Sequence, residues 1–282
     1  MLTFLKCFDT SKNQYHKSIM KTKITLFLSM IFITFIVTAQ SPNAPSVSKG
    51  LTFSTDKKAC LNTEQRSDLL QSIKVNIDEL KLQNRLTFSI QNRGSHPLFI
   101  WPIQKSNNVT FNEIYSIYNY VDHNTEFPNQ LTDYNCGTKT YDTSGGYNHK
   151  GVDIVTWPFP WAMMENDGVE IIAAAPGQII FIRDGEFDLS CTQNTTTPWN
   201  IVVIQHSDGS VALYGHMKSG STTTKNVGDM VTEGEYLGIV GSSGQSDIPH
   251  LHFEVYEDNI DGIGTGLIDP YSGNCNGMNS DT

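Results

Sequence analysis

The chain has 282 residues and a formal net charge of −10 at pH 7. Removing residues 1–39, with five lysines and one aspartate, would leave 14 basic and 28 acidic residues, a net charge near −14. This acidity argues against nucleic acid or an anionic membrane as a partner bound by non-specific electrostatics. Any polymer partner would have to be recognised locally.

Residues 1–39 are expected to hold an upstream segment and then a secretory signal peptide at about 20–39. The stretch from Ile24 to Ala39 is apolar, two lysines precede it, and it ends in small residues. It is too short for a comfortable membrane span, and Gln40 rather than Cys follows it, so no stable membrane or lipid anchor is indicated. The sequence therefore predicts an exported protein, periplasmic or extracellular.

Four cysteines follow the expected signal peptide: Cys60, Cys136, Cys191 and Cys275. An even number of cysteines in an exported chain predicts two disulfide bonds, with three possible connectivities. Free buried thiols are the alternative. A zinc–thiolate site is disfavoured, because no two of these cysteines lie at Cys-x-x-Cys spacing.

Residues 40–61 contain Ser, Pro and Asn and are expected to form a linker. From Thr63 to about Gln83, leucine and isoleucine recur at helical spacing, which predicts an amphipathic helix. Asn62 is placed to cap this helix, with Gln65 three residues further on.

Residues 62–130 are expected to form a small N-terminal region of helix and strand. Beyond the helix, strands are predicted at Leu86–Ile90 and Leu98–Ile103. The core of such a region is too small for an independent domain. It would either pack on the rest of the chain or act as a propeptide.

Residues 131–282 are expected to form the main domain. From Ile171 onward, short apolar runs are separated by Gly and Asp-Gly turns, a pattern typical of an antiparallel sheet or sandwich. The predicted fold class is therefore mainly β, with the helical and strand extension before it. The predicted strands are Ile179–Ile182, Ile201–Gln205, Val211–Tyr214 and Tyr236–Val240.

Metal-ligand residue types stand at short spacings in this domain. His149 and Asp153 are four residues apart, His250 and His252 are two apart, and His216 lies between the two pairs. Two imidazoles and one carboxylate suit a catalytic zinc that keeps one position for water. Such a site lowers the pKa of water and polarises a carbonyl, as amide hydrolysis requires.

The spacing also indicates how these side chains are presented. Strict alternation places His250, His252 and Glu254 on one side of a predicted strand and apolar residues on the other. The even spacing of His149 and Asp153 would place both on one face of an extended strand, which the glycine and β-branched residues around them favour over a helix. The sequence has no His-Glu-x-x-His helix, so a thermolysin-type arrangement is excluded.

Four motifs follow one another in this half of the chain: His149-Lys-Gly-Val-Asp153, Tyr214-Gly-His216, Gly241-Ser-Ser-Gly244 and Pro249-His-Leu-His-Phe-Glu254. Any one of them is a weak signal, but their order and spacing, from about Tyr141 to Tyr271, resemble the lysostaphin/LytM family of zinc metallopeptidases. The resemblance covers just under half of the chain and implies the fold of that family.

The resemblance also implies roles for individual residues. His149, Asp153 and His252 would bind one zinc ion. His216 and His250 would be catalytic histidines without a bond to zinc, which orient or deprotonate the attacking water and stabilise the oxyanion. A tyrosine shortly before the first ligand often donates to the oxyanion in this family, and Tyr141 is slightly favoured over Tyr147 for this role.

Other residues near the motifs allow more than one interpretation. Glu254 would either orient an imidazole or be a solvated or ion-paired carboxylate. Two departures from the family pattern, Ser246–Ile248 and Trp157–Trp161, would border the cleft and affect substrate preference, with Trp157, Trp161 and Asp247 as the tuning side chains. His96, His123 and His206 are interpreted as structural or surface residues.

The function implied by the resemblance is hydrolysis of peptidoglycan stem or cross-bridge peptides by an exported zinc metalloendopeptidase. One alternative is a non-catalytic LytM-like module that activates or docks cell-wall enzymes; such modules typically lack ligands that are present here. Another alternative is a secreted zinc peptidase of Gly-rich proteins. Each of these functions implies a peptide or protein partner rather than nucleic acid.

Overall fold

The computed structural model describes residues 60–88, 97–121, 149–192, 197–257 and 266–271. The chain divides into two compact units, Met1–Ser54 and Thr55–Thr282, and every described residue belongs to the second. The expected signal peptide lies outside the described residues. Within them, no helix combines the length and apolar character that a membrane span needs.

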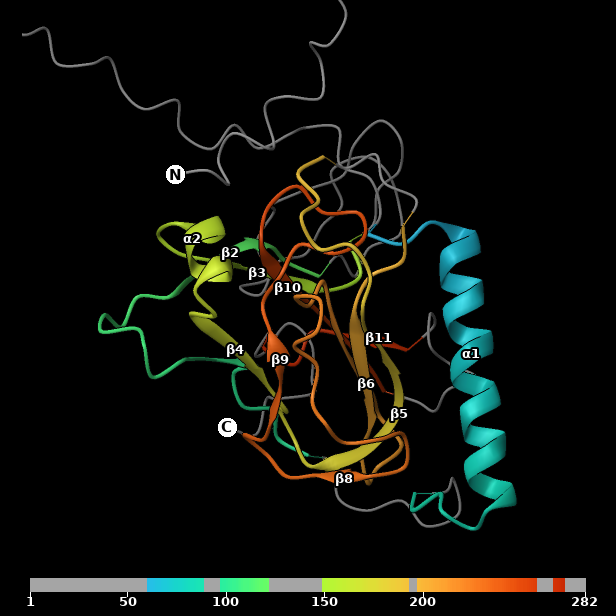
Figure 1. The fold of residues 1–282 in the computed structure, drawn as a ribbon. Helices are drawn as coiled ribbons and strands as arrows, with labels where there is room; N and C mark the ends of the chain where they lie inside the picture. The colour runs from blue at the N-terminus through green and yellow to red at the C-terminus, as the bar shows by residue number, and fades with distance from the viewer. Residues whose placement is uncertain (1–59, 89–96, 122–148, 193–196, 258–265, 272–282) are drawn as a thin grey trace, which may run out of the picture. The chain divides into compact units, whose positions relative to one another are not determined.

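The strands of the described residues form two antiparallel sheets (Figure 1). The larger has eight strands, and the smaller has three, in the order β1, β4 and β9. The large sheet contains, in spatial order, β2 (Tyr115–Asn119), β3 (Val152–Thr156), β10 (His250–Tyr256), β7 (Val211–Gly215), β6 (Ile201–Gln205), β5 (Gly177–Arg183) and β8 (Met230–Val231), with β11 (Leu267–Ile268) paired to β10. The small sheet contains β1 (Ile103–Lys105), β4 (Val169–Ile172) and β9 (Tyr236–Ile239). The mainly β, antiparallel fold class is confirmed.

The two faces of the large sheet are buried in different ways. Along β6 and β7, Val202, Ile204, Ala212 and Tyr214 pack into a core that also contains residues of the small sheet. The alternate residues point the other way and pack with residues of helix α1 (Thr63–Leu82). Because side chains alternate along a strand, each central strand supplies both cores.

Helix α1 begins and ends close to the predicted positions. Asn62 is its N-cap and forms a complete capping box with Gln65, as predicted. The residues on the sheet-facing side of α1 are buried: Leu69, Ile73, Ile77 and Leu80. Burying such a side chain contributes roughly 1.5–3 kcal/mol, so these contacts rather than intrinsic propensity hold the helix on the sheet.

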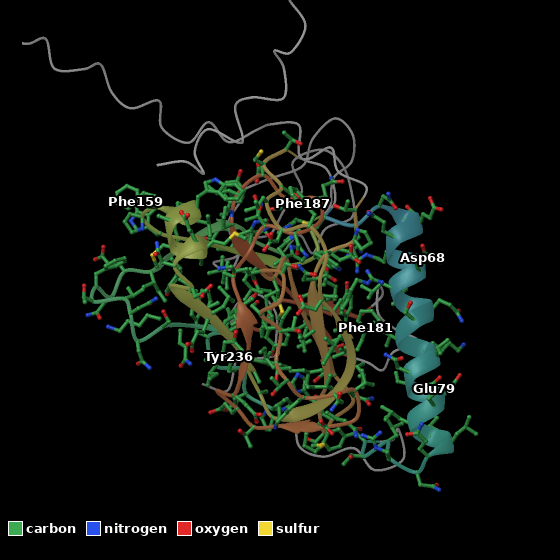
Figure 2. The ribbon with its side chains drawn as sticks, viewed as in Figure 1. Asp68, Glu79, Phe159, Phe181, Phe187 and Tyr236 are labelled. Atoms are coloured by element: carbon green, nitrogen blue, oxygen red, sulfur yellow. The ribbon has the colours of Figure 1, made fainter. Side chains whose placement is uncertain are left out.

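Figure 2 shows the two sides of α1. Asp68 and Glu79 are exposed, whereas Phe181 of β5 is 6% exposed and belongs to the core between α1 and the sheet. A hydrogen bond from the Asn76 amide to the carbonyl of Ile180, 3.0 Å long, also joins the helix to β5.

The second helix, α2 (Pro160–Glu165), is short and begins with proline at its first position. It begins within Trp157–Trp161, the aromatic segment that departs from the family pattern. Phe159, at its N-cap, is 70% exposed (Figure 2).

Two predicted strands before the main domain are wrong as stated. Of Leu98–Ile103, only Ile103 lies in a strand, because Pro102 has no N–H group for a ladder hydrogen bond and β1 begins after it. The described part of Leu86–Ile90 is not a strand either. In the main domain, Tyr236–Val240 ends one residue earlier than predicted, at Ile239, and the other predicted strands are present.

Candidate metal and catalytic centre

Strand β10 presents the second pair of histidines on the α1-facing side of the large sheet. Leu251, Phe253 and Val255 point into the core between the two sheets, so His250, His252 and Glu254 point to the opposite face. The predicted alternation is therefore found. On the neighbouring strand β3, Asp153 lies directly opposite His252 in the antiparallel register.

His149 reaches the same place from the segment before β3. The strand begins at Val152, so His149 is not on it, and the expectation of one extended strand from His149 to Asp153 is corrected. The imidazole is held by a 2.8 Å contact of Nδ1 with the carbonyl of Tyr120, and its Nε2 is 3.0 Å from Asp153 Oδ2. A loop thus brings the first histidine over the strand that carries the carboxylate.

Gly151 allows the segment that carries His149 to pack closely against strand β10. A Cβ atom at this position would lie 2.8 Å from the carbonyl oxygen of Phe253 and 2.9 Å from the ring of His252. Neither neighbour has room to move, because one is backbone of β10 and the other is a buried imidazole. The glycine of the His-x-Gly-x-Asp motif is therefore required by contact with His252.

His252 is oriented from both sides of its ring. Its Nδ1 is 2.7 Å from Asp153 Oδ1, and its Nε2 is 2.8 Å from Glu254 Oε1. When Nε2–H donates to the Glu254 carboxylate, the lone pair of Nδ1 faces Asp153 and His149. This is how a metal-binding histidine is usually oriented.

Glu254 has both roles that the sequence allowed. Besides accepting from His252, it forms a two-bond ion pair with Arg66 of α1, at 2.7 and 2.9 Å, and accepts a 2.6 Å hydrogen bond from the Tyr256 hydroxyl. Burial raises the pKa of the Glu254 carboxyl, but Arg66 and His252 together outweigh it and hold that pKa well below its usual value. The carboxylate therefore stays charged behind the imidazole.

His216 and His250 face the same space from two other backbone positions. Their Nδ1 atoms contact the carbonyls of Ser243, at 2.6 Å, and Ile248, at 2.7 Å. Their Nε2 atoms are buried and have no hydrogen-bond partner among the described residues, and their ring centroids are 4.5 Å apart. His216 has a positive φ of 62°, a sparsely populated conformation of the kind that clusters at functional sites.

Trp199 packs against His216 and His252 and was not identified from the sequence. Its indole is fully buried, with ring centroids 4.9 Å from His216 and 5.5 Å from His252. A Cβ atom at Gly215 would lie 2.6 Å from this indole, which explains the glycine before His216.

Residues 147–263 match peptidase family M23. This part of the chain is a peptidase family M23 domain.

Curated relatives match over short stretches only. The chain is similar to the cell division protein DipM of Caulobacter vibrioides, with 37% identity over 90 residues, 32% of this chain and 14% of DipM. It is also similar to the DD-carboxypeptidase/endopeptidase Mpg of Neisseria meningitidis, at 44%, and to the murein hydrolase activator EnvC of Escherichia coli, at 38%; each alignment has 55 residues, 20% of this chain and 12% of the relative. The aligned part is thus less than a sixth of each relative.

Among solved structures, the M23 catalytic domain of EnpA from Enterococcus faecalis is similar to this chain, with 22% identity and a TM-score of 0.36. That match covers 57% of this chain and 92% of EnpA's.

The donor atoms of the M23 domain fit a zinc ion. One atom each from His149, Asp153 and His252 lies within 4.8 Å of the others, all three residues are buried, and the set of two imidazoles and one carboxylate suits zinc. Asp153 also accepts a hydrogen bond from buried Asn119 of β2, which the sequence did not indicate.

Charges in the site shift its acid–base groups in opposite directions. Burial and the nearby charge of His250 lower the pKa of His216. Burial also lowers the pKa of His250, but the charge of Asp153 and its neighbours outweigh burial, and the net shift is upward. The pKa values of these two neighbouring histidines are therefore shifted in opposite directions.

Cys60, which the sequence predicted to form a disulfide bond, lies in this site. It forms one group with His149, Asp153 and His252, and its Sγ is 3.5 Å from His252 Nδ1. Burial raises the pKa of the thiol, but the charge of His252 and the neighbouring imidazoles together outweigh it and lower that pKa well below its usual value. The sequence disfavoured a zinc–thiolate site because no two cysteines lie at Cys-x-x-Cys spacing. That spacing detects ligands of one local loop and not a cysteine brought in by a distant segment, as Cys60 is here.

No disulfide bond is found among the described residues, whereas two were expected in the chain. Cys60 and Cys191, the cysteines within the described residues, are both free thiols. Cys136 and Cys275 lie outside the described residues, as do Tyr141 and Tyr147, the candidate oxyanion donors.

Tyr118 is a tyrosine near the site that the sequence did not single out. Its ring centroid is 6.5 Å from that of His250, and its hydroxyl donates to Asp247 Oδ2 at 3.4 Å. Asp247 thus lies beside the site, as expected, and Trp157 is 40% exposed. Of the three histidines expected to be structural or surface residues, His206 is described. It packs edge-on against Phe99 and contacts the Pro176 carbonyl, which is a structural role. His96 and His123 lie outside the described residues.

Proposed function

We propose that this protein is an exported zinc metalloendopeptidase that hydrolyses peptide bonds in peptidoglycan stem or cross-bridge peptides. The observation that carries the proposal is the convergence of His149, Asp153 and His252 at one point, beside two buried histidines whose Nε2 atoms face the same space. Modules that only dock partners have no need for this complete set.

In the proposed centre, His149, Asp153 and His252 hold the zinc ion. When bound, zinc supplies a water of lowered pKa and a positive charge for the carbonyl oxygen of the scissile bond. Glu254 keeps the His252 ring in the required tautomer, and Asn119 orients Asp153.

Two histidines carry the proton transfers. His216, whose pKa is lowered, accepts the proton of the attacking water at Nε2. His250, whose pKa is raised by Asp153, donates from Nε2 to the developing oxyanion or to the leaving amine. Opposite pKa shifts in two neighbouring groups are the pattern expected of an acid–base pair.

The substrate class rests on the M23 domain and its relatives. Mpg is named as a carboxypeptidase and endopeptidase, and EnvC as an activator of murein hydrolases. The signal-like segment at about 20–39 supports export to the compartment where peptidoglycan lies.

A non-catalytic activator is the second candidate, and one observation favours it. Cys60 adds a fourth donor to the group of three, and a zinc site with four protein ligands is typically structural rather than catalytic. The similarity to EnvC points the same way.

Digestion of purified sacculi separates these two candidates. We expect the purified protein to carry about one zinc per chain, to release cross-link peptides identifiable by mass, to lose this activity with a chelator and to regain it with zinc. The variant His252→Ala should lose both zinc and activity. Intact sacculi after incubation with the zinc-loaded protein and with zinc-loaded Cys60→Ala, together with stimulation of a separate cell-wall hydrolase, would establish the activator instead.

A further inference from the structure

The structure places a thiol where the proposed peptidase needs an open position. Cys60 lies two residues before the N-cap residue of α1, far in sequence from the M23 domain, yet its Sγ joins the donor atoms of His149, Asp153 and His252. A catalytic zinc keeps a position for water, whereas a fourth protein ligand closes the site.

The geometry suits coordination by sulfur. With typical Zn–S and Zn–N bond lengths and tetrahedral angles, a thiolate sulfur lies about 3.5 Å from an imidazole nitrogen bound to the same ion. The distance from Cys60 Sγ to His252 Nδ1 is 3.5 Å. Thiolates are also preferred ligands of zinc.

Contacts on the C-terminal side of Cys60 hold it in this position. Leu61 is 6% exposed and belongs to the core between α1 and the sheet. One turn into the helix, Arg66 forms its two-bond ion pair with Glu254, which itself contacts His252. The thiol is therefore presented by a docked helix and not by a free end.

We propose that the Cys60 thiolate is a fourth ligand of the metal and that it keeps the peptidase latent while α1 stays docked. The inference rests on the proposed zinc peptidase function and adds its regulation. Activation is a ligand exchange without a redox change: the bond between sulfur and metal breaks, a water molecule takes the vacated position, and the thiolate takes up a proton from solvent.

Cobalt substitution tests the coordination without any assay of activity. In the cobalt-loaded protein we expect a thiolate-to-cobalt charge-transfer band in the near ultraviolet. Cys60→Ala and Cys60→Ser should abolish this band and keep the visible bands of bound cobalt. Cys191→Ala, which removes the other free thiol of the described residues, is the matched control and should retain the band.

A second measurement tests latency. Because a tethered ligand competes at a high effective concentration, release of cross-link peptides by Cys60→Ala should exceed that of the wild type and of Cys191→Ala by on the order of tenfold or more. Melting temperatures of all variants show whether each is folded, and Cys60→Ser repeats the test if Cys60→Ala is not.

The outcomes distinguish this inference from the proposed function. No charge-transfer band in the wild type, or a band that survives in Cys60→Ala, overturns the coordination and leaves the peptidase proposal in place. A band lost in Cys60→Ala without a rise in activity overturns latency. Failure of every metal-loaded variant to cut sacculi overturns the peptidase proposal itself, even if the band identifies Cys60 as a ligand.

Discussion

His149, His216 and His250 are oriented by one device: Nδ1 contacts a backbone carbonyl, and Nε2 faces the site. His252 is reversed, with Nε2 held by the Glu254 side chain and Nδ1 facing the site. The identities of all four could be predicted from motif spacing. Their orientations could not, because the carbonyls of Tyr120, Ser243 and Ile248 leave no signal in side-chain pattern.

For the two catalytic histidines, we predict that His216→Ala and His250→Ala retain zinc but lose activity by roughly two to three orders of magnitude. The reason is that each variant removes a proton-transfer or oxyanion contact. Metal analysis and peptide release from sacculi, measured on the same preparations, check this. Zinc loss in either variant would show that a metal ligand has been taken for a catalytic residue.

Among the elements, α1 is the one whose position bears most directly on the site. It covers the face of the large sheet from which His252 and Glu254 project, and Arg66 connects it to Glu254. The Arg66 and Glu254 side chains are 14% and 0% exposed, so this ion pair is largely shielded from water. A buried carboxylate that loses its partner is strongly destabilising.

We therefore expect Arg66→Ala to lower the free energy of unfolding by about 3–5 kcal/mol, the range for breaking a buried ion pair. Lys81→Ala, on the same helix, is the matched control: its pair with Asp78 is 3.6 Å long and both side chains are more than half exposed. Exposed pairs contribute roughly 0–1 kcal/mol. Urea denaturation of both variants measures the difference, and equal effects would refute the role given to Arg66.

The sequence predicted α1 better than any other element before the M23 domain, because its capping box and apolar spacing are local signals. The strand at Leu98–Ile103 was mispredicted because the apolar pattern was followed across Pro102. Cys60 could not be placed from the sequence, since its neighbours in the site are contributed by residues about ninety and more positions away. Local pattern predicts elements, whereas contacts between distant segments depend on how they pack.

Without a metal ion, a proton on His149 balances the negative charge of Asp153. Burial lowers the pKa of His149, but the charge and hydrogen bond of Asp153 outweigh it and raise that pKa to about 9. The pKa of His149 in the folded state thus lies above its unfolded value of about 6.5. The attraction between protonated His149 and Asp153 therefore stabilises the fold fully below about pH 6.5. This stabilisation is lost as pH rises through about 9.

Zinc requires the unprotonated imidazole, so metal binding and protonation compete. We predict that the melting temperature of the metal-free protein falls between pH 6.5 and about 9, and that the rise in melting temperature on adding zinc grows over the same interval. Thermal unfolding at several pH values, with and without zinc, checks this. A zinc effect that is constant with pH would contradict the protonated state assigned to His149.

The chain of contacts from Arg66 through Glu254 to His252 has a thermodynamic consequence. A metal ion and a docked helix act as two ligands of one sheet face, and coupling between two ligands is reciprocal. If docking of α1 raises the affinity of the site for zinc by some factor, bound zinc raises the affinity of the sheet for α1 by the same factor. The amide protons of α1 should therefore exchange with solvent more slowly once the metal is bound, although the helix itself gains no contact along most of its length.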